Sequence, residues 1–329
     1  MGSRVEPGEP GVRRIVVLRG GAIGDLIVTE PSLRALRLAW PAARILLLGN
    51  ASAGSLLVAD GIIDDALSLD ADWLAPLFAE DDSLANAALR RIEERLRGET
   101  DLAVAWLREP ESAPVRHLSR LAGRVVAGPS VPPAGTKVHM VDHLASALQR
   151  AGIPVRDRMP RVRQAPIATE DERRRRGEAS GSDIAIHPGS GGRRKNWPAE
   201  RFAEVAAGVR DLGLEPIVVA GPADADATKP LRALGCRVVE PRDLLALADV
   251  LSDCVAYVGN DSGVSHLAAA LGVATVAIFG PTDPRVWAPR GPRVETIWVG
   301  PEALAMPAEE ALARVSVRDT LDAIRRCLS

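Results

Sequence analysis

The most constraining part of the sequence is residues 257–284, where the pattern changes from strand to helix and back to strand. An apolar segment leads into a turn at residues 259–261, and a run of small apolar residues follows over 262–271. Gly272 ends this predicted helix, because a left-handed cap favours a residue without Cβ. A β-branched run at 275–279 then predicts another strand. This succession is typical of a parallel α/β unit.

The start of that predicted helix is suited to an anion, because its free N–H groups and its dipole both favour negative charge. We expect Asp261 to be the N-cap residue, with the amides of Ser262 and Gly263 exposed next to it. His266 lies about one turn further along. Asp is also a good N-cap in its own right. The stretch alone therefore leaves a purely structural explanation open.

The same alternation of strands and helices runs through both halves of the chain. Residues 15–18 form an apolar run, followed by a glycine-rich loop and a helical stretch to Trp40. Apolar runs at 183–187 and 217–220 begin a similar series in the second half. The sequence therefore predicts an α/β fold of two Rossmann-like, doubly wound domains.

Domain boundaries follow from changes in composition. Prolines and charged residues, including the basic run 173–176, dominate between residues 154 and 182, which is typical of a linker. We expect four parts: a flexible tail at 1–12, an N-terminal domain at 13–160, a linker at 161–182 and a C-terminal domain at 183–329. The last helix, 317–328, is free to pack back on the N-terminal domain.

Composition excludes several classes of partner. The formal net charge is −2 and aromatic residues make up 3%, which disfavours nucleic acid as a partner. The three cysteines are scattered and lack metal-ligand spacing: Cys236, Cys254 and Cys327. We therefore expect them to be reduced core thiols of a cytoplasmic protein. No apolar run approaches transmembrane length, and the first residues lack the apolar core of a signal peptide. The sequence predicts a cytoplasmic location.

Three loops at the carboxyl ends of predicted strands hold the residues that could carry chemistry. Ligands of doubly wound sheets bind at these ends, and the cleft between two facing domains is the expected site. The first loop holds Gly21, Gly24 and Asp25, and the third is the turn around Asp261. The second, at residues 190–195, offers glycine amides and a lysine, which suit a phosphate.

Simpler explanations of these loops stay open on the residues alone. Asp25 could be a helix cap, and Lys195 could be a solvated loop lysine. The first loop does not match G-x-G-x-x-G, and Gly49-Asn50 follows the next strand where a nicotinamide-binding fold prefers an acidic residue. A dehydrogenase is therefore disfavoured.

Three sequence blocks, in order, resemble a known family. They are GDLIVTEP from Gly24, HPGSGGRRKNWPAERF from His187, and GNDSGVSHLAAALG from Gly259, with GPTDP shortly after the last. Together they resemble the hallmark blocks of glycosyltransferase family 9, the family of ADP-heptose:lipopolysaccharide heptosyltransferases. The resemblance covers nearly the whole chain from Arg13, and three ordered blocks are far more specific than any one.

The resemblance implies a GT-B fold, in which two Rossmann-like domains face a central cleft. It implies an inverting, metal-independent glycosyltransferase that moves a sugar, foremost heptose from ADP-heptose, to an acceptor hydroxyl. The acceptor would be lipopolysaccharide core, another glycan or a small molecule. No cofactor and no metal are expected beyond the nucleotide-sugar co-substrate, and no nucleic acid takes part. Transient contact with a membrane surface is compatible with this activity.

The resemblance also assigns roles to individual residues. Asp25 matches the proposed general base, in an acceptor-side loop with Gly21 and Gly24. Asp261 matches the acid that contacts the hydroxyls of the donor sugar. The donor diphosphate is assigned to Lys195, Ser190, Ser262, Gly263 and His266. By looser alignment, Asp224 meets the ribose, and residues 241–245, with Asp243 and Leu244, line the adenine.

Elementary chemistry agrees with these roles. A positioned carboxylate that removes the proton of the attacking hydroxyl contributes about 10²–10⁴-fold to the rate. Without Mg²⁺, Lys195 and a helix N-terminus must stabilise the leaving diphosphate. The N-terminal half is charge-balanced, however, whereas a polyanionic lipopolysaccharide acceptor needs basic residues there. The identity of the acceptor therefore stays open.

Two other functions remain as alternatives. One is a non-hydrolysing sugar-nucleotide epimerase of the same fold, which would need further acid and base residues that the sequence does not assign. The other is a non-catalytic nucleotide-sugar-binding protein. Asp25 and Lys195 each lie within one of the family's sequence blocks, which favours an enzyme over the second alternative.

Overall fold

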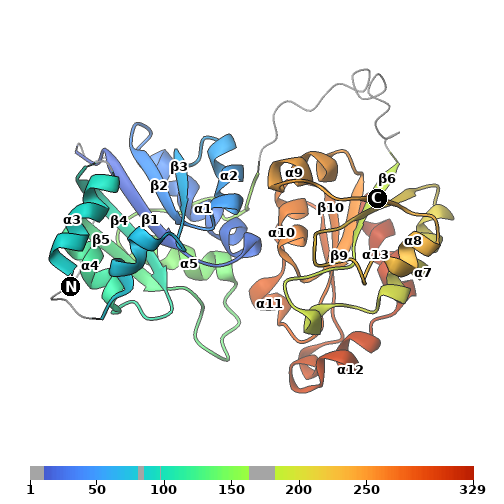
Figure 1. The fold of residues 1–329 in the computed structure, drawn as a ribbon. Coiled ribbons are helices and arrows are strands. Elements are labelled where there is room, and N and C mark those ends of the chain that lie inside the picture. The colour runs from blue at the N-terminus through green and yellow to red at the C-terminus, as the bar shows by residue number, and fades with distance from the viewer. Residues whose placement is uncertain (1–10, 81–84, 97, 163–181) are drawn as a thin grey trace, which may run out of the picture. The chain divides into compact units, whose positions relative to one another are not determined.

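The computed structural model describes residues 11–80, 85–96, 98–162 and 182–329. The predicted tail up to residue 10 and the predicted linker from 163 to 181, with its basic run, lie outside the described residues. Contacts divide the chain into two compact units, Met1–Arg158 and Met159–Ser329 (Figure 1). Each unit contains one sheet with helices packed against it.

The first unit has a five-stranded sheet in which each pair of neighbouring strands is parallel. Its strands are β1 (Arg14–Arg19), β2 (Arg44–Gly49), β3 (Asp65–Ser68), β4 (Thr100–Leu107) and β5 (Ala122–Pro129). The helical segments are α1 (Ile23–Ala39), α2 (Ala51–Ala59), η1 (Asp72–Phe78), α3 (Ala85–Arg95), α4 (Ala113–Leu121) and α5 (Met140–Arg150). The apolar residues of β1 are fully buried, as expected for a central parallel strand covered on both faces.

The strand order of this sheet, β3-β2-β1-β4-β5, places the loop after β1 where the direction of the strand order reverses. The chain moves outward in one direction through β2 and β3, then crosses to the other side of β1 with β4 and β5. Such a reversal is where ligands of α/β sheets bind, at the carboxyl ends of the strands. Asp25 lies in the first turn of α1, directly after this loop.

The second unit has a six-stranded parallel sheet in the order β11-β10-β9-β6-β7-β8. Its strands are β6 (Asp183–His187), β7 (Glu215–Val219), β8 (Arg237–Val239), β9 (Ala256–Asn260), β10 (Ala274–Ile278) and β11 (Val294–Ile297). Its helical segments are η2 (Arg193–Lys195), α7 (Ala199–Arg210), α8 (Lys229–Ala233), α9 (Leu244–Ser252), α10 (Gly263–Ala270), α11 (Pro284–Trp287), η3 (Pro301–Ala305), α12 (Ala308–Ala313) and α13 (Val317–Leu328). Here the reversal lies between β6 and β9, so the loops after these two strands meet.

The C-terminal helix α13 packs against β10, β11 and α7 of the second unit. Its buried residues Ala323 and Ile324 join the same core cluster as Phe202 and Val276. The helix therefore completes the apolar cover over this sheet. The expectation that it packs back on the N-terminal domain stays a prediction.

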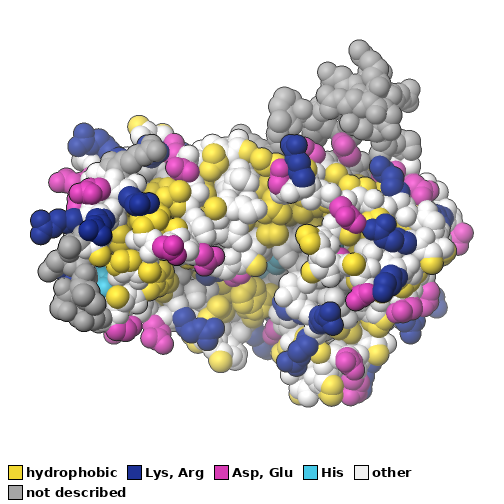
Figure 2. All heavy atoms as spheres, viewed as in Figure 1, with side chains coloured by type: hydrophobic (Ala, Val, Ile, Leu, Met, Phe, Trp, Pro, Cys, Tyr) yellow, Lys and Arg dark blue, Asp and Glu magenta, His cyan; other side chains and the backbone are white. Residues whose placement is uncertain are grey.

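The surface shows charges of both signs. Figure 2 shows Lys and Arg side chains interspersed with Asp and Glu over the visible face, in keeping with the formal net charge of −2. The three cysteines are free and buried. Within the described part of the chain, no helix has the length and apolar character needed to cross a membrane.

Candidate active site

Asp25 is held by two contacts after the carboxyl end of β1. Its Oδ1 accepts a hydrogen bond from Arg19 Nη2 at 3.0 Å, and its Oδ2 accepts one from the backbone N–H of Ala22 at 2.9 Å. Gly21 has a φ of +115°, and a Cβ placed there would lie 2.5 Å from Asp25 Cγ. Glycine is therefore required at this position. Asp25 does cap the helix, as the structural explanation predicts, but its side chain also remains 29% exposed.

Arg19 is the buried partner of this carboxylate. Its side chain is only 5% exposed, and its Nε donates to Thr29 Oγ1 at 3.3 Å. Burial lowers the pKa of the Arg19 guanidinium, and the charge of Asp25 opposes that shift. Because arginine starts from so high a pKa, the group stays protonated. The pair thus consists of a fixed buried cation and a carboxylate that solvent can reach.

Lys195 lies at the end of η2, in the segment that follows β6. Its Nζ forms an ion pair with Asp261 Oδ2 at 2.6 Å, across to the end of β9. The Lys195 side chain is 39% exposed, whereas that of Asp261 is 7% exposed. The sequence-predicted lysine and acid are therefore brought together, with the ammonium on the solvent side.

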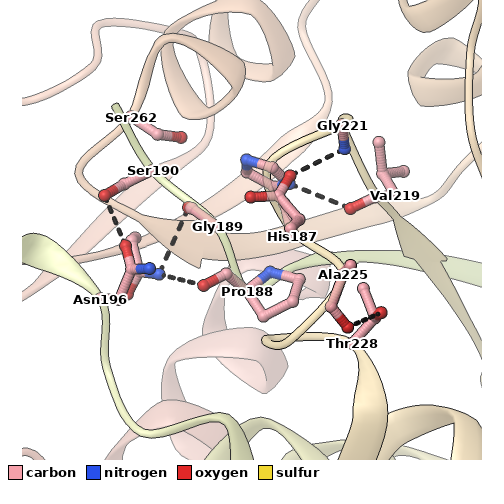
Figure 3. A network of polar contacts seen from close by, with 12 residues as sticks. His187, Pro188, Gly189, Ser190, Asn196, Val219, Gly221, Ala225, Thr228 and Ser262 are labelled. Carbon is pink, nitrogen blue, oxygen red and sulfur yellow. Dashed lines mark hydrogen bonds and ion pairs between the residues drawn. The ribbon is translucent and has the colours of Figure 1, made fainter. Parts of the chain in front are cut away.

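Ser190 organises the loop in front of this lysine. Its hydroxyl lies 2.5 Å from Asn196 Oδ1 and 2.8 Å from the carbonyl oxygen of Gly192, and it accepts from the Gly192 N–H at 3.2 Å. Figure 3 shows Ser190 directed toward Asn196. These bonds close the loop on itself, so Ser190 stays next to the segment that contains Lys195.

The start of α10 differs from the sequence prediction in one respect. The N-cap residue is Ser262, whose Oγ accepts from the Ser265 N–H, and not Asp261. The prediction was wrong because the carboxylate of Asp261 pairs with Lys195 instead, while its backbone N–H bonds to Ile278. Gly263 is the first helical residue. The amide-rich helix start therefore follows directly after the Lys195–Asp261 pair.

Buried polar groups anchor α10 to β9. The Tyr257 hydroxyl lies 3.0 Å from Ser265 Oγ, which donates to the carbonyl oxygen of Asn260 at 2.5 Å. Burial raises the pKa of the Tyr257 phenol, so this group is neutral. His266, in the first turn of the helix, is 5% exposed. The helix N-terminus is thus fixed relative to the end of the strand.

Asp224, the candidate ribose ligand, lies beside the loop after β6. Its Oδ2 accepts from the Gly221 N–H at 2.7 Å and lies 3.9 Å from His187 Nδ1. His187 Nδ1 also lies 3.0 Å from the carbonyl oxygen of Val219 (Figure 3). Burial lowers the pKa of this imidazole, so it is neutral, and Nδ1 must carry the proton to donate to that oxygen. A Cβ at Gly189 would overlap the Asp224 carboxylate, so the loop needs glycine there.

The other nucleoside candidates have local roles in the structure. Asp243 is the N-cap of α9, and its Oδ1 accepts from the Ala246 N–H at 2.8 Å. This bond lowers the pKa of the Asp243 carboxyl. Leu244 is the first residue of the same helix. Their assignment to the adenine stays a prediction.

The sequence pattern of glycosyltransferase family 9 (heptosyltransferase) matches residues 127–313, more than half of the chain. The chain belongs to glycosyltransferase family 9. Lipopolysaccharide heptosyltransferase 2 of Escherichia coli K12 is 36% identical over 110 residues, which are 31% of this chain and 32% of that protein. The chain thus aligns with only about a third of the length of this curated relative.

Solved structures of the family share the fold over the full length. A family 9 glycosyltransferase from Veillonella parvula is 20% identical, with a TM-score of 0.76 and coverage of 99% of both chains. An E. coli heptosyltransferase solved with ADP is 16% identical, with a TM-score of 0.69 and coverage of 95% of this chain and 99% of that one. The α/β architecture is therefore the two-domain GT-B fold of the family.

Within this family 9 chain, the predicted residues form two separate groups. Asp25, Gly21 and Gly24 belong to the first unit. The second unit brings together the ion pair of Lys195 and Asp261. The start of α10, with Ser262, Gly263 and His266, and the loop of Ser190 adjoin it, while Asp224 lies in the loop after β7, against His187 and Gly221. Among the residues that the structure describes, no group of three or more His, Cys, Asp or Glu could hold a metal ion.

Two polar residues of these sites were not predicted from the sequence. Arg19 ends β1 and holds Asp25, and Asn260 ends β9 and contacts the loop after β6. Both are polar residues that end a strand directly after its apolar run, immediately before a motif loop. That position is the signal that could have identified them.

Proposed function

We propose that this chain is an inverting, metal-independent glycosyltransferase that moves heptose from ADP-heptose to an acceptor hydroxyl. The observation that carries the proposal is the half-exposed ammonium of Lys195, held by buried Asp261 at the start of α10. Support for the donor comes from the E. coli family member solved with ADP, and support for the acceptor from relatives named lipopolysaccharide heptosyltransferases. The proposed acceptor is accordingly lipopolysaccharide core, with another glycan or a small molecule as alternatives.

In the proposed donor complex, the second unit stabilises the diphosphate. Lys195 has three N–H donors, so its ammonium can keep Asp261 while it donates to phosphate oxygens. The amides at the start of α10 add partial positive charge, since they point along the helix dipole. The Ser190 hydroxyl has one proton and joins the set by turning it from Asn196 to a phosphate oxygen, and the remaining acceptor capacity of Asp261 receives sugar hydroxyls. These groups together stabilise the charge that develops as the diphosphate leaves.

Asp25 is the proton acceptor in this proposal. The acceptor oxygen forms a bond to the anomeric carbon as the bond from that carbon to the diphosphate oxygen breaks. The electron pair of the broken bond leaves with the diphosphate, and the hydroxyl proton goes to Asp25. Each carboxylate oxygen of Asp25 accepts one bond from the protein, so each still has capacity to accept the proton.

The proposal needs no resident cofactor and no nucleic acid, and it allows transient contact with a membrane surface. We place the reaction in the cytoplasm, where free thiols such as those of Cys236, Cys254 and Cys327 stay reduced.

The donor is tested first by thermal shift with ADP-, UDP-, GDP- and dTDP-sugars. A true donor at about 100 times its dissociation constant adds about 2.7 kcal/mol to the free energy of unfolding. We expect ADP-heptose to give the largest shift. A larger shift with another nucleotide would replace the proposed donor.

The reaction is tested by incubation with ADP-heptose and either phosphorylated core acceptors or neutral sugars, with and without EDTA. We expect transfer to the phosphorylated core with inverted configuration, and full activity in the chelator. Activity that EDTA abolishes and Mg²⁺ or Mn²⁺ restores would contradict the metal-independent mechanism. Epimerisation of the donor without any acceptor would replace the transferase by an epimerase.

A further inference from the structure

Asn260 makes an unusual set of buried contacts at the end of β9. Its side chain is fully buried. Its Oδ1 accepts from the Trp197 N–H at 2.9 Å, and its Nδ2 donates to the carbonyl oxygens of Pro188 at 2.8 Å and Gly189 at 3.3 Å. One carboxamide therefore satisfies backbone groups at both ends of the segment between β6 and α7.

These contacts lie directly beside the residues of the candidate donor site. Trp197 is two residues after Lys195, Gly189 immediately precedes Ser190, and Asn260 immediately precedes Asp261. The Lys195–Asp261 ion pair therefore joins the same two segments as Asn260 does, but its lysine side chain is 39% exposed. The buried amide and the ion pair are neighbouring links between one loop and one strand end.

The buried link is the one able to fix the loop. The Lys195–Asp261 pair is buried only at its carboxylate: its lysine side chain is 39% exposed, so solvent screens the pair and the long side chain loses entropy in it. Buried hydrogen bonds are costly to break, because the freed groups find no water to replace the lost partner. The location of Lys195 should therefore depend on Asn260 more than on the ion pair itself.

We propose that Asn260 is a positioning residue for the donor: it holds the loop after β6 at the distance from α10 at which Lys195, Ser190 and the helix amides meet one diphosphate. This inference rests on the proposed function. Asn260 itself contacts no phosphate in the proposal. Its effect on donor affinity is transmitted through the backbone of residues 188–197.

The first test compares Asn260→Ala with Ile324→Ala. Ile324 is also fully buried in the core of the second unit, on α13, and no role in the donor site is assigned to it. We expect Asn260→Ala to speed hydrogen exchange of the Trp197 amide by about tenfold or more, and to weaken ADP binding, measured by calorimetry, by about tenfold. Ile324→Ala should leave both within about twofold, even where it lowers the melting temperature more.

The outcomes separate this inference from the proposed function. Wild-type affinity for ADP in Asn260→Ala, or equal weakening by both variants, would overturn the positioning role. A wild-type chain that binds no ADP would refute the proposed donor instead. In that case the hydrogen exchange of the Trp197 amide still tests Asn260. An unchanged rate in Asn260→Ala would overturn the positioning role, and a faster rate would show that Asn260 holds the loop.

A second variant, Asn260→Asp, keeps the inference testable where Asn260→Ala does not fold. A protonated carboxyl can accept from Trp197 and donate to Pro188, as the amide does, whereas the ionised carboxylate has no proton to donate. We expect the ratio of its ADP affinity to that of wild type to rise as the pH falls from about 8 to about 5.5, because burial favours the protonated form. A ratio that does not change with pH would show that the amide hydrogen bonds do not set donor affinity.

Discussion

The two candidate sites are built around ion pairs of opposite arrangement. In the first unit the cation is buried and the carboxylate is accessible: Arg19 is 5% exposed and Asp25 is 29% exposed. In the second unit the carboxylate is buried and the cation is accessible: Asp261 is 7% exposed and Lys195 is 39% exposed. In each pair the buried member orients the side chain of the accessible one. The first unit therefore has an accessible negative group at its candidate site, and the second has an accessible positive group.

This difference indicates what each site can bind. A carboxylate held in one orientation by a permanent cation, and still reached by solvent, suits the capture of a proton during the reaction. An ammonium held by a buried carboxylate suits an anionic ligand, because it is anchored at one side and free to donate at the other. Burying one member of an ion pair costs desolvation, so such pairs are weak contributors to stability. Their arrangement is better explained by ligand chemistry.

The largest expected effect comes from Asp25→Ala. If the accessible carboxylate takes the proton, kcat falls by about 10²–10⁴-fold. ADP affinity should stay within about threefold, because the diphosphate is assigned to the second unit. Steady-state transfer rates and calorimetry measure the two quantities. Asp65→Ala, which removes an exposed carboxylate elsewhere in the first unit, serves as the control and should leave both unchanged. An equal loss of ADP affinity would make Asp25 a structural residue.

The next effect concerns the accessible cation. Lys195→Ala should weaken ADP binding by about 10- to 100-fold, since hydrogen bonds to charged groups contribute about 1.5–3 kcal/mol. Lys229→Ala is a matched control, because Lys229 also pairs with an aspartate of the second unit but both side chains are highly exposed. Calorimetry with ADP should show no change for this control. Wild-type affinity in Lys195→Ala would place the diphosphate elsewhere.

A smaller effect is expected from the buried cation. Arg19→Met removes the charge that holds Asp25 and should lower the free energy of unfolding by about 1–2 kcal/mol. Arg116→Met removes an exposed arginine that pairs with Glu80, and its effect should stay below about 1 kcal/mol. Urea denaturation compares the two variants. Equal stability losses would mean that the burial of Arg19 has no energetic consequence.

The smallest effect is the pH dependence contributed by His187 in the second unit. Burial lowers its pKa in the folded state below the ordinary value of 6.5. As the pH falls, the unfolded chain therefore binds the additional proton before the folded chain does. The contribution of His187 to the free energy of unfolding is complete above about pH 6.5 and is lost as the pH falls below it. The loss cannot exceed about 1.4 kcal/mol per pH unit.

His187→Gln tests this dependence, because glutamine keeps an N–H donor for Val219 without titrating. Urea denaturation at about pH 7.5 and about pH 5.5 should show a larger loss of stability in wild type than in the variant. Identical losses in the two proteins would show that His187 does not titrate differently on unfolding.

Much of the fold could be predicted from the sequence because its determinants are local. The apolar runs that became β1, β6 and β9 are short and continuous, as buried parallel strands require. Gly272 was predicted to end a helix in the left-handed conformation, and its φ is +83°. Asp25, Lys195 and Asp261 were located by motif, and the last two do meet.

What the sequence could not decide was the partner of each polar side chain. Lys195 and Asp261 are separated by 66 residues, and Asn260 and Pro188 by 72. Whether Asp261 caps α10 or pairs with a lysine depends on which loop the strand order brings beside it. In this protein β6 lies next to β9, so Asp261 turned to Lys195 and Ser262 became the cap. The sequence by itself determined the elements and the motif positions, because propensity and periodicity act over a few residues. The tertiary structure alone decided the polar contacts at the sites, because hydrogen bonds between distant residues exist only once the sheet has set its strand order.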